Sequence, residues 1–576
     1  MNKIKTTVLI LCCWLLVLPV TSQISIVPLP QEVREGRGVF QFSEDAYPVK
    51  IGTSSSDQRE LLFQQLSDVA SEQFNISLEQ SSTNPVIRIG NPSKDEDVKA
   101  FLKGKNLWPD DRIGDQGYVM YIDKSDIVIA AHSDQGIFYG VQSLKQLMKA
   151  SNDNELPSYT IIDWPDLPYR GVMDDISRGP VPHMDFMKSQ VRRFSEMKIN
   201  MMSFYIEHIV KTKSHGGFAP SAGGISIEEW KELSDYASNY HVQLVGSFQS
   251  LGHFEKILSF PQYSHLGATD RMLSPVNEAS TDFLIEVIGE MLPAFSSGFF
   301  NVNGDEAWDL GRGNLKKYAD SIGVARIYAD HMNRLLEFII SQGKRPMMWG
   351  DITLQHPKVF EMLPEEVMFL TWDYSAYESF ADFIDPVKNA GFDFMVCPGV
   401  LNSNRMMPDF NMSVINIRNF VNEGFEKGAS GVLNTVWDDG GRHAFSRDWY
   451  GVAFGADQSW NPNKKPLNDF DHRFSKAIYG DQDMNYTKAI HKMNELAAFG
   501  ATQEMTNTIM WKQLIPERGE DLTLNLSEWD DIEAVVKEAK SLLAAFETAY
   551  YPMDIPFLEF TMDQYLYMAY ARRNLI

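Results

Sequence analysis

Two adjacent carboxylates, Asp305 and Glu306, form the part of the sequence best suited to chemistry. They directly follow the apolar segment FFNVNG. Neighbouring side chains on an extended segment diverge, so one acid can reach a leaving oxygen while the other reaches a different group on the same substrate. This pattern favours a mechanism in which a group of the substrate takes part in the reaction.

Glu306 must carry a proton if it is the acid that protonates the leaving oxygen. Repulsion from the Asp305 carboxylate and desolvation by nearby tryptophans both disfavour the ionised form of Glu306. We therefore predict that its pKa lies above the ~4.3 of a free glutamate. Asp175, Asp373 and Asp439 are the alternative acids.

The region around these acids, from 166 to 460, alternates short apolar strands with helical stretches. That alternation is typical of β/α units around a parallel sheet. Eight strands and a length of about 280 residues fit an α/β fold of the (β/α)₈ TIM-barrel type. The predicted strands are Tyr169–Ile176, Asn200–Glu207, Val242–Phe248, Phe299–Gly304, Pro346–Gly350, Val367–Trp372, Phe392–Cys397 and Gly431–Trp437.

In such a barrel the reacting groups lie at the carboxyl ends of the strands. Indole rings stack on the apolar faces of sugars, and carboxylates bind hydroxyls or protonate a glycosidic oxygen, so acids and tryptophans together indicate a glycosidase. The end of the seventh strand, CPGVLN, offers no carboxylate as a second acid. The residues that close the predicted strands are Asp174, Asp175, Arg178, Glu207, His208, Gln249, Gly252, His253, Asp305, Glu306, Trp349, Asp351, Trp372, Asp373, Tyr374, Asn402, Arg405, Trp437, Asp438 and Asp439.

An ordered set of segments resembles glycoside hydrolase family 20, the β-N-acetylhexosaminidases. NVNGDEAWDLGRG (301–313) is similar to the Gly-Asp-Glu motif of that family, and residues 117–147 are similar to the domain that precedes its barrel. The other matching segments are YRGVMDDISRG (169–179), SFYIEH (203–208), SFQSLGHFEKIL (247–258), MMWGDI (347–352), TWDYSAY (371–377) and GVLNTVWDDGG (431–441).

The resemblance implies a role for individual residues. Glu306 would be the general acid/base, and Asp305 would orient the 2-acetamido group of the substrate and stabilise the charge that develops on it. His253 would form a relay to Glu306, and Glu207 stands where many members have an aspartate. The implied sugar-binding residues are Arg170, Trp349, Trp372, Tyr374, Trp437 and Asp439.

Three departures from the family pattern concern the substrate. The tyrosine that members commonly supply after the seventh strand is missing, and Tyr374 after the sixth strand is the expected substitute. Asn303 replaces the more usual small residue before the Gly-Asp-Glu motif, and Asp439 stands where the family usually has a glutamate. N-acetylated and free-amine glucosaminides are therefore both candidate substrates.

The implied activity is that of an exo-acting retaining β-N-acetylhexosaminidase that acts on glycans with a terminal N-acetylhexosamine, without a cofactor or metal. An exo-β-glucosaminidase of the same fold and an inactive glycan-binding barrel are the alternatives. A metal-dependent barrel hydrolase with His253, Asp305 and Glu306 as ligands is a third. Such a site usually recruits more histidines than the two at this face.

The chain outside the barrel predicts two further regions. Short strands and helices between 23 and 165 indicate an α+β accessory domain, and residues 461–576 read as helical. The last residues, 562–576, resemble a helix without a cap or breaker, so either truncation or packing on the barrel is expected there.

Composition and the first residues restrict the class of protein. The net charge of −25 would repel nucleic acid and anionic membranes. Hydrophobic residues make up 44% of the chain, which is enough to form hydrophobic cores. Residues 1–22 read as a signal peptide that is too short to span a membrane. Its removal leaves Cys397 as the one thiol, which suits a bacterial periplasm or cell surface without disulfides.

Overall fold

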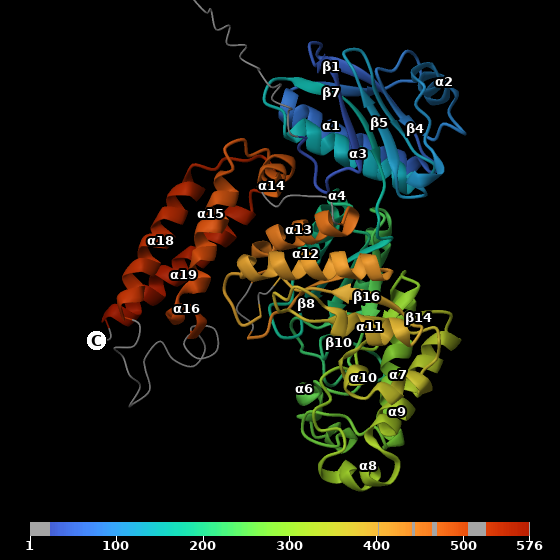
Figure 1. The fold of residues 1–576 in the computed structure, drawn as a ribbon, viewed down its shortest axis with the longest axis vertical. Helices are drawn as coiled ribbons and strands as arrows, with labels where there is room; N and C mark the ends of the chain where they lie inside the picture. The colour runs from blue at the N-terminus through green and yellow to red at the C-terminus, as the bar shows by residue number, and fades with distance from the viewer. Residues whose placement is uncertain (1–23, 401–402, 441–443, 463–468, 505–525, 575–576) are drawn as a thin grey trace, which may run out of the picture.

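The computed structural model describes residues 24–400, 403–440, 444–462, 469–504 and 526–574, so the expected signal peptide and Asn402 lie outside the described residues. Figure 1 shows a sheet domain, a barrel and a group of helices, in that order along the chain. The predicted fold class is confirmed: a closed parallel barrel follows an α+β domain and precedes a helical region.

All eight barrel strands overlap the strands predicted from the apolar runs. The closed order places each strand beside its sequence neighbour, and the last strand pairs with the first. The strands are β8 (Tyr169–Asp175), β9 (Met201–Tyr205), β12 (Gln243–Ser247), β13 (Phe299–Asn301), β14 (Arg345–Trp349), β15 (Met368–Trp372), β16 (Asp393–Cys397) and β17 (Gly431–Val436). A short parallel ribbon, β10 (Val210–Lys211) with β11 (Ile225–Ser226), lies between β9 and β12.

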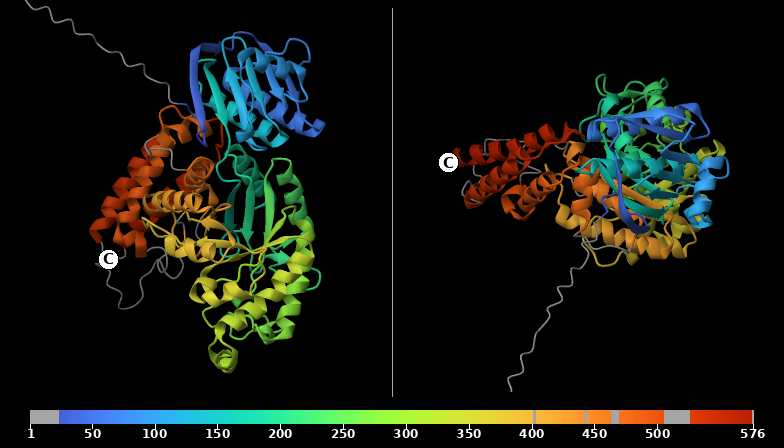
Figure 2. Two further views of the ribbon diagram at one scale, coloured as in Figure 1. Left: turned by 45° about the vertical axis from the view of Figure 1, so that its right-hand side comes forward. Right: turned by 90° about the horizontal axis from the view of Figure 1, so that it is seen from above.

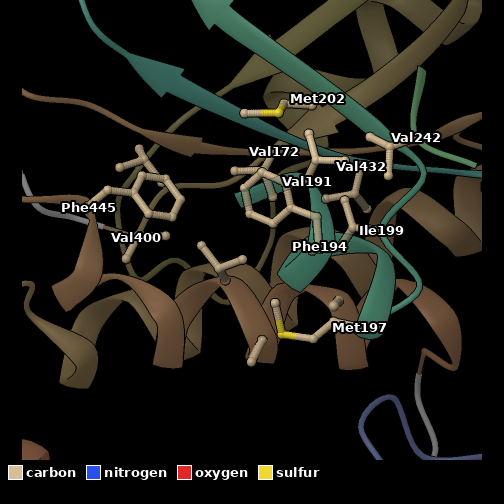
Figure 3. Packing of buried hydrophobic residues seen from close by; sticks show 14 of the residues in the cluster. Val172, Val191, Phe194, Met197, Ile199, Met202, Val242, Val400, Val432 and Phe445 are labelled. Carbon is tan, nitrogen blue, oxygen red and sulfur yellow. The ribbon is translucent and has the colours of Figure 1, made fainter. Parts of the chain in front are cut away.

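Helices cover the outside of the barrel. Figure 3 shows Phe194 of α4 (Met184–Glu196) beside Val172 and Val432, which project outward from the neighbouring strands β8 and β17. Met197, in the turn after α4, belongs to the same buried cluster. The interior is filled by a separate cluster that includes five methionines. The other helices around the barrel are α5 (Ile227–Ser238), α6 (Glu255–Leu258), α7 (Glu278–Met291), α8 (Lys316–Ile322), α9 (Val324–Ser341), α10 (Asp351–Gln355), α11 (Ala381–Asn389), α12 (Phe410–Lys427) and α13 (Trp449–Trp460).

The first domain is a seven-stranded mixed sheet in the order β1-β7-β5-β6-β4-β2-β3. Its helices α1 (Ser56–Phe74) and α3 (Asp134–Lys149) pack together, and α3 also contacts α4 of the barrel. α2 (Glu96–Lys105) packs apart from them with Val128 and Ala130. The strands are β1 (Glu32–Gln41), β2 (Ala46–Gly52), β3 (Ser77–Gln80), β4 (Ile87–Gly90), β5 (Tyr118–Ile122), β6 (Ile127–Ala130) and β7 (Glu155–Asp163).

This domain is joined to the amino ends of the barrel strands. The buried ammonium of Lys198, just before β9, lies 2.9 Å from the Asp163 carboxylate at the end of β7. The carboxyl ends of the barrel strands therefore open on the opposite side, where Figure 1 shows α6 and α8.

The remaining helices form an extension beside the barrel, as Figure 2 shows from two directions. Buried Arg193 of α4 makes an ion pair with Asp554 and a hydrogen bond to Tyr479, which ties this extension to the barrel. Within the described residues, no helix is both long and apolar enough to span a bilayer. The helices are α14 (Phe470–Tyr479), α15 (Asn485–Asn494), α16 (Gly500–Glu504), α18 (Leu526–Ala544) and α19 (Asp554–Asn574).

Candidate active site

A pocket of about 240 Å³ opens at the carboxyl ends of the barrel strands. It brings together residues that follow different strands, as expected for this barrel type. Among the described residues, its lining combines acids, aromatic rings, an imidazole, a serine and one arginine: Arg178, Tyr205, His253, Asp305, Glu306, Trp349, Trp372, Tyr374, Ser403, Trp437 and Asp439.

The two adjacent acids are carried on a tight turn after β13. Asn303, Gly304 and Glu306 all have positive φ angles, of 54°, 80° and 49°. A side chain on Gly304 would come within 2.8 Å of Met332 in α9, and the Tyr328 hydroxyl of the same helix donates to the Gly304 carbonyl. The turn is therefore held from behind by α9, which fixes where both acids project.

Asp305 lies at the bottom of the pocket. Its side chain is only 9% exposed, and its Oδ1 accepts a 2.8 Å hydrogen bond from the Gln249 amide. The same amide donates to the Tyr205 hydroxyl at 2.6 Å. Burial raises the pKa of Asp305, and the positive charge of His253 opposes that rise. Gln249 thus holds the Asp305 carboxylate in place, and the positive charge of His253 stabilises its ionised form.

Glu306 lies nearer the mouth of the pocket, with 35% of its side chain exposed. His253 Nε2 lies 3.4 Å from Glu306 Oε2 and 3.6 Å from Asp305 Oδ2. The same imidazole nitrogen therefore faces both carboxylates. On the far side of this ring, Nδ1 lies 4.0 Å from Glu207, which is not part of the pocket lining. The structure therefore places Glu207, His253 and Glu306 in a row.

The pKa of Glu306 is lowered, and not raised as predicted, because the positive charge of His253 lies beside it. A hydrogen bond from His253 lowers that pKa, and this effect outweighs the desolvation that raises it. Hydrogen bonding to Glu306 and the nearby Asp305 charge, working against desolvation, raise the pKa of His253 to about 9. The prediction was wrong because it considered only Asp305 and the tryptophans and left out the positive charge of the imidazole. At neutral pH the proton rests on His253.

Asp351 supports the same turn. Its Oδ2 accepts the Glu306 backbone N–H at 3.0 Å, and desolvation with the Asp305 charge raises its pKa to about 7. It lies behind Glu306 and not in the pocket lining. Asp351 therefore fixes the backbone of Glu306 and leaves the Glu306 carboxyl group free to face the pocket.

The three tryptophans predicted to wall the sugar-binding site all line the described part of the pocket. Asn303 accepts the Trp349 indole N–H at 2.9 Å, so the unusual residue before the Gly-Asp-Glu motif orients this ring. Trp372 stacks on Tyr374 with 5.3 Å between ring centroids, and Trp437 donates its indole N–H to the Tyr374 hydroxyl at 2.5 Å. Tyr374 thus faces the pocket, where a contact with an acetamido group remains a prediction.

Among the described residues, the arginine that lines this pocket is Arg178 and not Arg170, which corrects the sugar-binding role predicted for Arg170. Arg170 begins β8, is 1% exposed and donates to backbone carbonyls, including that of Lys198, at the amino ends of the strands. Arg178 follows the end of β8, makes an ion pair with Asp439 and lies 2.7 Å from the Asp175 carboxylate. An arginine at the start of a barrel strand cannot reach a pocket at its end.

Three lining residues were not predicted as sugar contacts. Arg178 was identified by its position after the first strand but was given no role. Tyr205 ends β9, and its apolar neighbours in the sequence made it look like a core residue. Ser403 donates to Asp439 at 2.9 Å from the loop after β16, and no local pattern distinguishes it from other loop serines.

Comparisons with known proteins match this architecture. A sequence model described as glycosyl hydrolase family 20, domain 2, matches residues 23–164, and one described as the catalytic domain of the same family matches residues 167–402. Together the two matches cover more than half of the chain. The chain belongs to glycosyl hydrolase family 20.

Curated relatives carry β-hexosaminidase names at low identity. A β-hexosaminidase subunit A1 of Dictyostelium discoideum is 24% identical over 307 residues, which is 49% of this chain and 54% of that protein. A β-hexosaminidase of Porphyromonas gingivalis is 24% identical over 320 residues, 49% of this chain and 39% of that protein. The matched region spans about half the length of these relatives or less.

Solved structures of family 20 proteins share the fold. Flavobacterium johnsoniae chitobiase has a TM-score of 0.66 at 17% identity, and the match covers 96% of this chain and 94% of that one. A mutant Streptomyces plicatus β-hexosaminidase in complex with the product GlcNAc has a TM-score of 0.63 at 17% identity, over 79% of this chain and 94% of that one. These values show that the overall fold is shared.

Proposed function

We propose that this protein is an exo-acting retaining β-N-acetylhexosaminidase that uses the 2-acetamido group of its own substrate as the nucleophile. One observation carries the proposal. Among the described lining residues, the only carboxylate besides Asp305 and Glu306 is Asp439, which is paired with Arg178. The described part of the pocket therefore offers an acid and a charge stabiliser but no separate carboxylate positioned as a nucleophile.

The two acids then divide the reaction between them. The proton held by His253 passes to Glu306 and from Glu306 to the leaving oxygen, while the acetamido carbonyl oxygen attacks the anomeric carbon and forms an oxazoline. Asp305 accepts the acetamido N–H and stabilises the positive charge that develops on that group. Water, deprotonated by Glu306, opens the oxazoline at the anomeric carbon, and two inversions give net retention.

The size of the pocket supports removal of one terminal sugar. Its volume of about 240 Å³ lies below the ~300–1,000 Å³ of sites that enclose drug-sized ligands, which favours a single sugar ring as the occupant. Three indoles offer flat apolar surfaces to that ring, and the Arg178–Asp439 pair offers donors and acceptors to its hydroxyls. The β-hexosaminidase names of the relatives and the GlcNAc held by the Streptomyces plicatus neighbour favour an N-acetylhexosamine.

The test compares substrates that differ only at C2. An aryl N-acetyl-β-glucosaminide should be hydrolysed at least about 10²-fold faster, in kcat/KM, than the matching β-glucoside, because the glucoside lacks the nucleophile. A thiazoline analogue of the oxazoline should inhibit competitively. Comparable rates on both glycosides would refute the mechanism, and a preference for the free 2-amino sugar would establish a glucosaminidase instead.

The His253 and Glu306 pair also predicts the alkaline limb of the pH–rate profile. The pair must hold one transferable proton, and in the free protein that proton leaves as the pH rises through the His253 pKa of about 9. kcat/KM should therefore fall at that pH. In His253→Asn the proton can rest only on Glu306, a carboxyl group, so the limb should move to lower pH.

His215→Asn is the matched control for this experiment, because His215 lies 2.9 Å from Glu286 and outside the pocket lining. It should keep the wild-type limb. An unchanged limb in folded His253→Asn would show that His253 does not hold the proton.

A further inference from the structure

A second cavity, of about 210 Å³, lies where the first domain, the barrel and the helical extension meet. Its lining comes from α1 and α3 of the first domain, from α4 of the barrel, and from Tyr550 and Tyr551, which precede α19. Glu196, the last residue of α4, lines it two residues before Lys198, which marks the amino ends of the barrel strands. The cavity is therefore on the opposite side of the barrel from the active site, and the proposed reaction does not use it.

Positive charge exceeds negative charge in this cavity. Its described lining holds three cationic side chains and two carboxylates: Lys145, Lys149, Arg192, Asp68 and Glu196. The excess contrasts with the net charge of −25 on the whole chain. A small anion is therefore attracted to this cavity more than to the average surface of the protein.

Lys149 and Glu196 neutralise each other within the cavity. Lys149 Nζ lies 2.6 Å from the Glu196 carboxylate, and both side chains are only 4% exposed. The Tyr551 hydroxyl also donates to Glu196. The Lys149 ammonium lies 4.6 Å from the centroid of the Tyr550 ring as well. This pair therefore has its partners inside the protein.

Lys145 is a buried cation whose described partners are neutral. The residue is 8% exposed, and its Nζ donates to the side-chain oxygens of Gln65, at 2.9 Å, and Gln142, at 2.8 Å. Among the described residues, no carboxylate forms an ion pair with it. An ammonium has three N–H donors, so one remains for an occupant of the cavity. An anion there would offset the cost of burying this charge beside neutral groups.

We propose that this cavity binds the oxyanion group of a small molecule, a carboxylate or a phosphate, with Lys145 as the buried charged donor and Arg192 at the mouth. Arg192 is exposed and donates to the Tyr236 hydroxyl at 2.7 Å through one of its N–H groups, which leaves others for the anion. The cavity is close in volume to the active-site pocket, so the oxyanion is carried by a molecule of up to about one sugar ring. This binding does not depend on the proposed hydrolase activity.

Isothermal titration calorimetry on the whole protein tests the cavity. The probes are inorganic phosphate and glucuronate, which distinguish the two oxyanions, and glucose, which is the neutral control. At least one anion should bind, and glucose should not. The bound anion should also raise the thermal unfolding midpoint as its concentration rises, because the cavity exists only where the three regions are folded together.

Replacing the cations should weaken this binding. Lys145→Met keeps the length of the side chain and removes its charge, so the Kd should rise at least about tenfold. Arg192→Gln, at an exposed position, should raise it by up to about fivefold. Lys344→Met is the matched control, because Lys344 lies outside the cavity, has its pKa lowered by burial and donates to the Phe295 and Ser297 carbonyls at 2.8 and 2.6 Å. It should bind the anion like the wild type.

The pH dependence of binding tests Lys145 without a variant. Burial lowers the pKa of Lys145 to about 8, whereas the charge of glucuronate is constant above about pH 5. Glucuronate should therefore bind equally well at about pH 6 and pH 7, and its affinity should fall above pH 8 as the ammonium loses its proton. The fall should be absent from the residual binding of Lys145→Met.

The carboxylate of Glu196 and the tyrosines of the cavity do not titrate in this range. Despite desolvation, the charges of Lys149 and Lys145 lower the pKa of Glu196. Desolvation raises the pKa of each lining tyrosine above its usual value. The other charged groups around Lys145, on α1, α3 and α4, are Asp68, Lys149 and Arg192.

Three results would overturn this site. One is that neither anion binds to the wild type. Another is unchanged binding in folded Lys145→Met, or an equal loss in Lys344→Met, since the anion would then bind elsewhere or respond only to net charge. If Lys145→Met does not fold, a constant affinity of the wild type for glucuronate from about pH 6 to pH 9 would exclude Lys145 as the charged donor.

Discussion

Asp305→Asn is expected to lower kcat by roughly 10²–10⁴-fold on an aryl N-acetyl-β-hexosaminide while the protein stays folded. The amide keeps the shape of the carboxylate and can still accept from Gln249, which holds Asp305 at 2.8 Å. It cannot stabilise the positive charge that develops on the acetamido group. Because this charge is largest in the transition state, the loss should fall on kcat more than on KM.

Asp373→Asn provides the control for this experiment. Asp373 follows β15 at the same end of the barrel, but its Oδ1 accepts the Ser375 backbone N–H at 2.7 Å and it is not part of the pocket lining. Its variant should keep wild-type kcat. The measurement is kcat for both variants together with their thermal unfolding midpoints. A folded Asp305→Asn protein with near-wild-type kcat would assign Asp305 to loop support alone.

The barrel could be predicted from the sequence because each strand is a short apolar run that ends in polar residues. That regularity also identified the pocket end, since parallel strands share one carboxyl edge. Asp305 and Glu306 were therefore placed correctly from their position after FFNVNG. The same rule selects Arg178, which follows its strand, over Arg170, which begins it. Arg170 was predicted only from resemblance, and the structure corrects it.

The electrostatics of the pocket could not be predicted in the same way. The pKa of Glu306 depends on the 3.4 Å separation between its Oε2 and His253 Nε2, which two loops set jointly. Gly252 shows how close those loops come, because a Cβ on it would lie 2.8 Å from the Asp305 carbonyl. Neither loop alone encodes that distance. Tyr205 was missed for a related reason, since only the closed barrel shows that the end of β9 faces the pocket.

Glu306→Gln should produce a loss that depends on the leaving group. The glutamine would keep the size of the side chain but has no proton to give, and Asp305 and the acetamido nucleophile stay in place. A disaccharide, whose alkoxide must be protonated as it leaves, should lose roughly 10²–10⁴-fold in kcat/KM. A dinitrophenyl glycoside, whose phenolate leaves without a proton, should lose no more than about tenfold. Initial rates on the two substrates measure the contrast.

The pH–rate profile gives an independent readout on the same variant. With the dinitrophenyl glycoside, Glu306→Gln should show no alkaline limb, because this leaving group departs without a proton and the titration of His253 then no longer limits the rate. Equal losses on both substrates in a folded protein would show that Glu306 is not the acid. Of the alternative acids, Asp175 is fully buried against Arg178 and Asp373 is bound to Ser375. Asp439, which lines the pocket, would then be the residue to replace next.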